Sequence, residues 1–274
     1  ARSLGVSALE VTAVERDVRS LHIFRALAEQ AHERGLAPEI RLDTRALDLR
    51  RTRVASLPKA DLILLGLALN ELFPSDVVDS AVDSEERLDP AERFLRQCLG
   101  RLLPGGRLIV IEPALRSTSR FLQRLRGRLS DRVVAPCLRA GPCPLLRRER
   151  DWCHASMAFH LPTPLAETAK AAGLRTGRLT YAYLTLAADG TRLPGFGDER
   201  ALRLVGGPVR SKGKTEWDGC GEAGLVRLRL LDRERGPSNA TLHDAPRGAR
   251  IRLPHAPSDG GSLRLRPALE IERI

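Results

Sequence analysis

Four of the five cysteines in this chain have a spacing that could bind a metal. Cys137, Cys143 and Cys153 fall within 17 positions, and Cys220 follows much later. Thiolates are soft ligands that suit zinc and iron–sulfur clusters. Four thiolates that meet in space would complete a site of either kind, so these four are the predicted metal ligands. Cys98 lies in an amphipathic helical pattern and is expected to pack in a core.

The gaps between these cysteines bear on which metal they would hold. Zinc knuckles place two cysteines two to four residues apart, whereas the gaps here are five, nine and 66 residues. Such spacing suits a cluster held by a long loop and one remote ligand. Pro136, Pro142 and Pro144 stiffen that loop, which lowers the entropic cost of ordering it. The spacing therefore favours an iron–sulfur cluster, with zinc as the alternative and scattered thiols as the interpretation without a metal.

The chain also carries a large excess of positive charge. Its 45 Lys and Arg residues exceed its 34 Asp and Glu residues, a formal net charge of +11. This excess predicts an anionic partner, most simply nucleic acid. The alternative for any one arginine is a solvated, charged face. The candidate RNA contacts precede or interleave with the cysteines, and they are Arg116, Arg120, Arg124, Arg147, Arg148, Arg210, Lys212 and Lys214.

Strands and helices alternate through about residue 115. Apolar runs predict strands over 9–15, 39–43, 61–69 and 107–113, and helical periodicity predicts helices over 18–34 and 88–103, the second broken at Pro104-Gly105-Gly106. This alternation is typical of an α/β fold with a parallel, Rossmann-like sheet. Short β-type runs separated by Gly, Pro, Asp and Ser predict a small β-rich part near the C-terminus. We expect a first domain over 1–189 with a cysteine-rich loop at 135–155, and a second over 190–274 that supplies Cys220.

In open α/β sheets, ligands bind at the carboxyl ends of the strands. Glu15 and Asp43 are predicted at two such ends, where they could contact the ribose and the adenine of a nucleotide-type cofactor. Gly66 would let the backbone approach the ligand, and Asn70 would lie just beyond. The alternative for both acids is a solvated strand end or a helix N-cap.

The tract Leu103-Pro104-Gly105-Gly106-Arg107-Leu108 before an apolar strand resembles class I S-adenosylmethionine-dependent methyltransferases from their second strand onward. The first strand and its Gly-rich loop would lie before Ala1, so we expect that an N-terminal piece is missing from the sequence.

Three tracts make the resemblance more specific: Ala135-Pro136-Cys137, Pro142-Cys143-Pro144 and Trp152-Cys153-His154. With the region around Cys220, they resemble the mitochondrial small-ribosomal-subunit methyltransferase-like family, whose members occur in mitochondria and in bacteria. The resemblance implies a 4Fe–4S cluster on the four cysteines, S-adenosylmethionine as cofactor, and the small ribosomal subunit and its rRNA as partners in assembly or translation. It implies a ribosome-associated protein of the bacterial cytoplasm or, alternatively, the mitochondrial matrix, monomeric when off the ribosome.

Two other functions fit the same residues. The chain could be an active rRNA methyltransferase, although no catalytic residue is identifiable, or a zinc-stabilised nucleic-acid-binding module without catalysis. No membrane partner is expected, because no apolar run reaches the roughly 18 residues of a membrane span.

Overall fold

The computed structural model describes residues 5–74, 85–174, 176–257, 261–267 and 269–274. Contacts within the chain divide it into two compact units, Ala1–Ala60 and Asp61–Ile274. The predicted domain boundary near residue 190 falls inside the larger unit, between its two sheets.

The first unit is a strand–helix–strand repeat. Strands β1 (Ala8–Glu15) and β2 (Glu39–Ala46) pair in parallel, and helix α1 (Val18–Glu33) connects them. Asp17 caps this helix, because its Oδ1 accepts the Arg19 N–H at 2.9 Å. Gly35 has a φ of 66° and ends the helix in the left-handed region that favours glycine. The first strand and the first helix are therefore where the sequence predicts them, whereas β2 extends three residues beyond the predicted end at Asp43.

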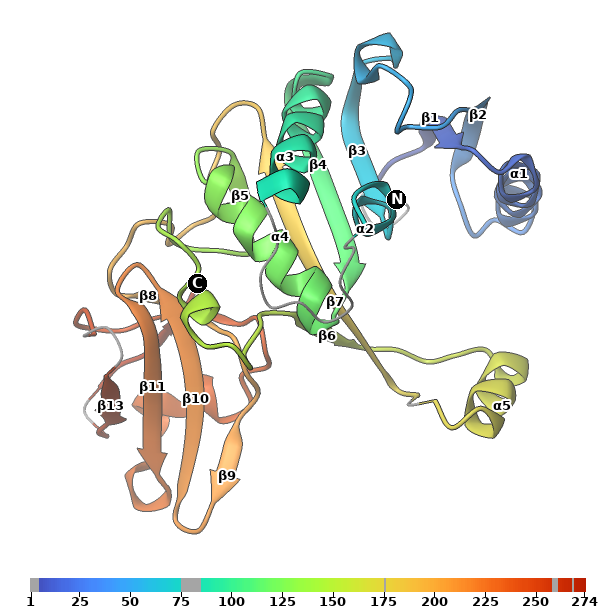
Figure 1. Cartoon of the computed structure of the whole chain (residues 1–274). Helices are drawn as coiled ribbons and strands as arrows, with labels where there is room; N and C mark the ends of the chain where they lie inside the picture. The colour runs from blue at the N-terminus through green and yellow to red at the C-terminus, as the bar shows by residue number, and fades with distance from the viewer. Residues whose placement is uncertain (1–4, 75–84, 175, 258–260, 268) are drawn as a thin grey trace. The chain divides into compact units, whose positions relative to one another are not determined.

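The second unit contains a mixed sheet in the order β3 (Ala60–Gly66), β4 (Leu102–Pro113), β7 (Arg178–Ala187) and β5 (Val133–Ala135). Strand β6 (Ala155–Ala158) pairs with the beginning of β7, and a two-stranded arm leads to helix α5 (Thr163–Ala171) (Figure 1). The remaining helices of this part are α2 (Leu69–Leu72), α3 (Glu85–Leu99) and α4 (Arg116–Arg128). The predicted α/β class is confirmed. In the described part of the chain, no helix is both long and apolar enough to cross a bilayer.

Two boundaries differ from the sequence prediction. The strand predicted over 61–69 ends at Gly66, and α2 follows it. Strand β4 begins at Leu102 and includes the Pro-Gly-Gly tract that we expected to be a break, so α3 ends earlier than predicted. Pairing of β4 with β7 covers only Arg107 to Pro113. The start of the strand lies beside β3, where a side chain at Gly106 would stand 3.0 Å from the Asp61 carbonyl. Tertiary contacts of this kind override the weak local preference of a few residues.

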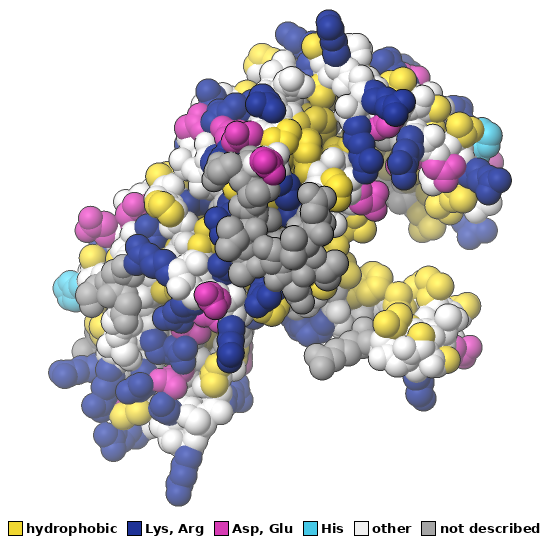
Figure 2. All heavy atoms as spheres, in the orientation of Figure 1, with side chains coloured by type: hydrophobic (Ala, Val, Ile, Leu, Met, Phe, Trp, Pro, Cys, Tyr) yellow, Lys and Arg dark blue, Asp and Glu magenta, His cyan; other side chains and the backbone are white. Residues whose placement is uncertain are grey.

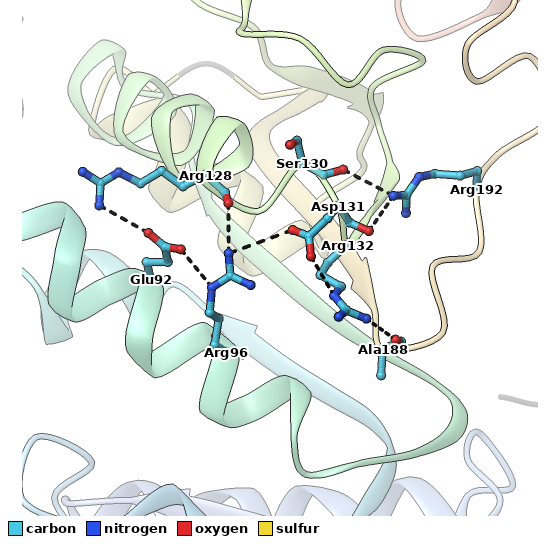
Figure 3. A network of polar contacts seen from close by, with 8 residues as sticks. All are labelled: Glu92, Arg96, Arg128, Ser130, Asp131, Arg132, Ala188 and Arg192. Carbon is cyan, nitrogen blue, oxygen red and sulfur yellow. Dashed lines mark hydrogen bonds and ion pairs between the residues drawn. The ribbon is translucent and has the colours of Figure 1, made fainter.

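A polar network fixes the ends of α3 and α4 (Figure 3). Arg96 of α3 is at its centre, where Nε donates to Glu92 Oε1 at 2.8 Å and Nη2 donates to the Arg128 carbonyl at 3.1 Å. Arg192, which follows β7, donates to the Asp131 carbonyl at 2.5 Å. The network therefore connects two helices to the segment that leads into the second sheet.

The second sheet of this unit has the order β13-β11-β10-β8-β12-β14, with β9 paired to β10. Its strands are β8 (Ala201–Leu204), β9 (Val209–Ser211), β10 (Lys214–Gly221), β11 (Gly224–Leu231), β12 (Arg250–Arg252), β13 (Ser262–Leu265) and β14 (Glu272–Arg273), and the short helix α6 (Ala240–His243) packs beside them. A core that includes Leu202, Trp217, Leu228 and Ile251 holds the sheet together. The predicted β-rich C-terminal part is confirmed.

The Gly219-Cys220-Gly221 tract of β10 lets β8 approach closely. A side chain at Gly221 would collide with the carbonyl of Ala201, and one at Gly219 would stand 3.0 Å from the Leu202 side chain. This close pairing sets Cys220 directly opposite Arg203 on β8.

Glu216 on β10 gives this sheet a pH-dependent contribution to stability. Its carboxylate lies 2.9 Å from Lys214 Nζ and 2.8 Å from Arg229 Nε. These hydrogen bonds lower the pKa of Glu216 from 4.5 to about 2. Because the folded-state pKa lies below that of the unfolded chain, the carboxylate stabilises the fold above about pH 4.5, and this contribution is lost as the pH falls towards 2.

We expect Glu216→Gln to lower the free energy of unfolding by about 1 kcal/mol at pH 7. The difference from the unsubstituted protein should shrink as the pH falls below 4.5, which urea denaturation at a series of pH values would measure. An undiminished difference down to the lowest pH at which the protein is folded would show that Glu216 does not act through its charge.

Candidate metal centre

The four predicted cysteine ligands line one cavity in the larger unit. Its volume is about 50 Å³, and its lining includes Cys137, Cys143, Cys153 and Cys220. Cys137 follows β5, Cys143 precedes a 3₁₀ turn at Pro144–Arg147, and Cys153 precedes β6, whereas Cys220 lies on β10. The fifth cysteine, Cys98, is buried in α3. In the described ranges, no three His, Cys, Asp or Glu side chains form a group that could hold a metal ion.

Arg120 of α4 holds the cysteine loop from the inside. Its side chain is 4% exposed. Nη1 donates to the carbonyls of Arg148 and Asp151 at 2.9 Å and to that of Leu145 at 3.4 Å, and Nη2 donates to the Leu146 carbonyl at 3.1 Å. Hydrogen bonds from a charged donor are stronger than neutral ones. Arg120 therefore orders the segment between Cys143 and Cys153. Because its side chain is buried, Arg120 is not accessible to RNA, contrary to the prediction from the sequence.

Arg126, two turns further along α4, fixes another part of the loop. Its Nη1 donates to the carbonyl of Ala140 at 3.2 Å and to that of Gly141. Gln123 of the same helix donates from Nε2 to the Cys153 carbonyl at 3.4 Å. One face of α4 thus contacts the loop on both sides of Cys143, and the loop's shape does not depend on a metal alone.

Arg203 of β8 reaches into the same cavity from the second sheet. It lies opposite Cys220 in the pairing of β8 with β10, and its Nη1 donates to Cys153 Sγ at 3.3 Å. Arg203 is 5% exposed. Nothing in the sequence singled it out, because it is one arginine within a short apolar run. It places a positive charge between a loop cysteine and the strand cysteine.

Burial governs the acidity of the thiols. It raises the pKa of Cys143 to about 12, and the neighbouring Cys137 acts in the same direction. The pKa of Cys220 is also raised by burial and then by the other three cysteines. For Cys137, burial outweighs the opposing effect of the Arg126 charge, so its pKa is raised as well. Because burial raises the pKa values of Cys137, Cys143 and Cys220, these three side chains favour the neutral thiol in the absence of a cation.

Several buried polar atoms of the cavity lining have no hydrogen-bond partner among the described residues. Most buried polar groups in proteins are paired, so a cluster of exceptions needs an explanation. These atoms are Ser119 Oγ, Gln123 Oε1, His154 Nδ1, and Nε and Nη2 of Arg126. The Ser119 hydroxyl and the two Arg126 nitrogens can donate, and donors beside four thiol groups are a chemically suitable lining for a cluster whose sulfurs accept hydrogen bonds.

The predicted cofactor residues of the first unit have local partners. Glu15 ends β1, and its Oε1 accepts the backbone N–H groups of Arg16 and Asp17 at 2.7 and 3.0 Å. Asp43 lies within β2, three residues before its end, and pairs with Arg45 at 2.8 Å. The strand is longer than predicted, so Asp43 is not a strand-end residue.

The other two predicted cofactor residues lie in the larger unit, at the end of β3. A side chain added at Gly66 would meet no atom within 4 Å, so the backbone is open there. Asn70 lies in α2, the helix that follows, and its Oδ1 accepts a hydrogen bond from Arg87 Nη2 at 3.1 Å. Leu67 between them has a φ of 59°, a conformation that a leucine rarely adopts.

Glu112 at the end of β4 supports this turn. Its Oε1 accepts the N–H groups of Leu69 and Asn70 at 2.8 and 3.3 Å, while Oε2 is buried without a partner. Burial raises the pKa of Glu112, although those two hydrogen bonds oppose the shift. The Glu112 carboxylate therefore holds the beginning of α2, two residues after the strained Leu67. Strained residues cluster at ligand sites, and the sequence did not single out Leu67.

The remaining candidate RNA contacts differ in exposure. Arg147, Arg148, Arg210 and Lys212 are exposed, and Arg116 and Arg124 are partly buried. Arg148 lies 3.5 Å from Asp151, and Lys214 is paired with Glu216. Figure 2 shows Lys and Arg side chains spread over the second sheet. The residues that project from the β9–β10 hairpin are Arg210 and Lys212.

Fold and cavity together define an α/β protein with a cysteine-lined cavity beside a second, β-rich sheet. Residues 7–251 match the family described as mitochondrial small ribosomal subunit Rsm22, and the chain belongs to this family. The family resemblance seen in the sequence is thereby confirmed. No curated protein matches the chain. A similar solved structure is precorrin 8W decarboxylase of Methanobacterium thermoautotrophicum, at 16% identity and a TM-score of 0.33, covering 65% of this chain and 67% of that chain.

Proposed function

We propose that this protein associates with the small ribosomal subunit in its assembly or in translation, and that a 4Fe–4S cluster on Cys137, Cys143, Cys153 and Cys220 joins its two sheets. The observation that carries the proposal is the shared cavity of four cysteines that lie up to 83 residues apart in the sequence. The family description supports the ribosomal partner.

The surroundings of the cysteines favour a cluster over a single zinc ion. Zinc–sulfur bonds of about 2.3 Å in a tetrahedral site require sulfur atoms about 3.8 Å apart. Here the four cysteines line one cavity, and they come from a long loop and a remote strand instead of closely spaced knuckles. A four-iron cluster is wider than one ion, because each thiolate binds a different iron. Such a cluster would supply a rigid cross-link and a one-electron centre.

The second part of the proposal is that exposed basic residues bind rRNA phosphates. Arg210 and Lys212 are exposed on the β9–β10 hairpin, which belongs to the same sheet as Cys220. Contacts of lysine and arginine with phosphate are non-specific in sequence and depend strongly on salt. A cross-linked centre would keep this hairpin and the cysteine loop, with exposed Arg147, in a fixed arrangement.

We expect the double variant Arg210→Ala and Lys212→Ala to weaken binding to purified small subunits by about tenfold. The logarithm of the binding constant should also depend less steeply on the logarithm of the salt concentration, by the amount that about two lost phosphate contacts would cause. Co-sedimentation at several salt concentrations would measure both. The matched control is Arg264→Ala, which removes an arginine of the same sheet that pairs with Glu234 at 2.6 Å. Equal binding by the double variant and the control, or binding that does not respond to salt, would exclude this surface.

Methyl transfer to rRNA is the second candidate function. The strained Leu67 beside the open Gly66 favours it, because ligands of open α/β sheets bind beyond the strand ends. We infer that S-adenosylmethionine would contact this turn. Calorimetry with S-adenosylmethionine tests this candidate function. The dissociation constant of the cofactor should change in a Leu67→Gly variant only if the turn contacts the cofactor.

A further inference from the structure

Two buried arginines at the cavity have no carboxylate partner in the part of the chain that the structure describes. Arg126 and Arg203 are 3% and 5% exposed and both line the cavity. The polar contacts recorded for Arg126 are carbonyl oxygens, and for Arg203 the contact is Cys153 Sγ. Other arginines of the second sheet, such as Arg227 with Asp218 at 2.7 Å, have acidic partners. Arg126 resembles Arg120 in its carbonyl partners, whereas Arg203 differs from both in that it donates to a cysteine sulfur.

A guanidinium group cannot lose its charge in a protein. Burying a charge without an opposite charge costs several kcal/mol or more. At this cavity the available groups of opposite charge are thiolates. An anionic centre among the cysteines would supply this opposite charge beside Arg203, whose Nη1 already contacts Cys153 Sγ at 3.3 Å.

The formal charges match those of a bound centre. Four thiolates around a doubly positive cluster core leave two net negative charges, and Arg126 and Arg203 supply two positive ones. Because Arg126 comes from α4 and Arg203 from β8, the two positive charges would reach the centre from two different elements of the fold. Arg203 also connects a loop ligand to the strand ligand, since it contacts Cys153 and lies opposite Cys220.

We propose that Arg126 and Arg203 are the counter-cations of the cysteine-bound centre, and that Arg203 sets its reduction potential through a hydrogen bond to Cys153. The proposal rests on the proposed cluster. A positive charge beside the centre favours the added electron, so it makes the potential less negative. Hydrogen bonds to ligand sulfurs act in the same direction.

The test compares Arg203→Gln, Arg203→Lys and the control Arg227→Gln, each purified without oxygen. Iron and sulfide content come first, and the midpoint potential follows from a redox titration monitored by electron paramagnetic resonance. Arg203→Gln should make reduction at least tenfold less favourable, which is 59 mV for one electron. Arg203→Lys should recover part of the shift because it keeps the charge, and Arg227→Gln should leave the potential unchanged.

Equal potentials for the Gln and Lys variants, or for the Gln variant and the unsubstituted protein, would overturn the role of the Arg203 charge while leaving the cluster in place. Should Arg203→Gln fail to fold, Arg126→Gln provides the same comparison. If the protein contained zinc without sulfide, the proposed cluster would be refuted but the role of the arginines would not. That role would then be tested by measuring the zinc affinity of the arginine variants. There a loss of 10- to 100-fold is expected from Arg203→Gln, and an unchanged affinity would overturn the proposal. A protein without any metal would overturn both.

Discussion

Replacing Cys220 with serine is expected to deplete the protein of its metal. Cys220 is the one predicted ligand from the second sheet, and three loop cysteines remain without it. Loss of an outer-shell partner already costs 10- to 100-fold in metal affinity, so loss of a ligand should reduce bound metal at least tenfold. Metal analysis of the purified variant measures this directly.

The same variant should also become less stable. Metal binding contributes to folding free energy, because the site does not exist in the unfolded chain. We expect the loop around Cys143 and Cys153 to become sensitive to proteolysis while β1, α1 and β2 keep their secondary structure. The loss of stability should affect both segments that the proposed centre would join, the cysteine loop and β10.

Cys98→Ala is the matched control. Cys98 is buried in α3, outside the cavity, and burial raises the pKa of its thiol to about 12. The substitution should cost about 1 kcal/mol of stability through packing, with full metal content. If Cys98→Ala and Cys220→Ser lost metal equally, the depletion would reflect general unfolding and not a lost ligand.

The second large effect is expected from Arg120→Met. Methionine replaces much of the buried volume but none of the donors to the four loop carbonyls. Unpaired buried acceptors cost about 1–3 kcal/mol each, with partial recovery by water. We therefore expect the free energy of unfolding to fall by about 4 kcal/mol, as measured by denaturant titration.

Arg148→Met provides the comparison. Arg148 is exposed, and its ion pair with Asp151 is 3.5 Å long. Exposed pairs contribute at most about 1 kcal/mol. If Arg120→Met proved as mild as Arg148→Met but weakened RNA binding, Arg120 would be a surface contact after all.

The contrast between these two arginines shows what the sequence could predict. The spacing of Arg116, Arg120 and Arg124 indicates one face of a helix. It does not indicate whether that face is solvated, because an arginine can be buried when backbone carbonyls accept its donors. The irregular loop over Leu145 to Asp151 provides those carbonyls, and no sequence pattern predicts their position.

Arg203 illustrates the same limit for the metal centre. The cysteines could be predicted as a set because thiols have few other reasons to cluster. Arg203 depends on the register of β8 against β10, which is fixed by the glycines around Cys220 and by packing across the sheet. Strand and helix alternation was readable to about residue 115 because local periodicity reports it. The start of β4, in contrast, lies beside β3, a neighbour distant in the sequence that local periodicity does not reveal.

The most direct test of the cysteine-bound cluster is the iron, sulfide and zinc content of the unsubstituted protein, purified without oxygen. We expect iron and acid-labile sulfide in equal amounts, about four of each per chain, and negligible zinc. One zinc per chain without sulfide, or no metal together with four freely reactive thiols, would contradict it.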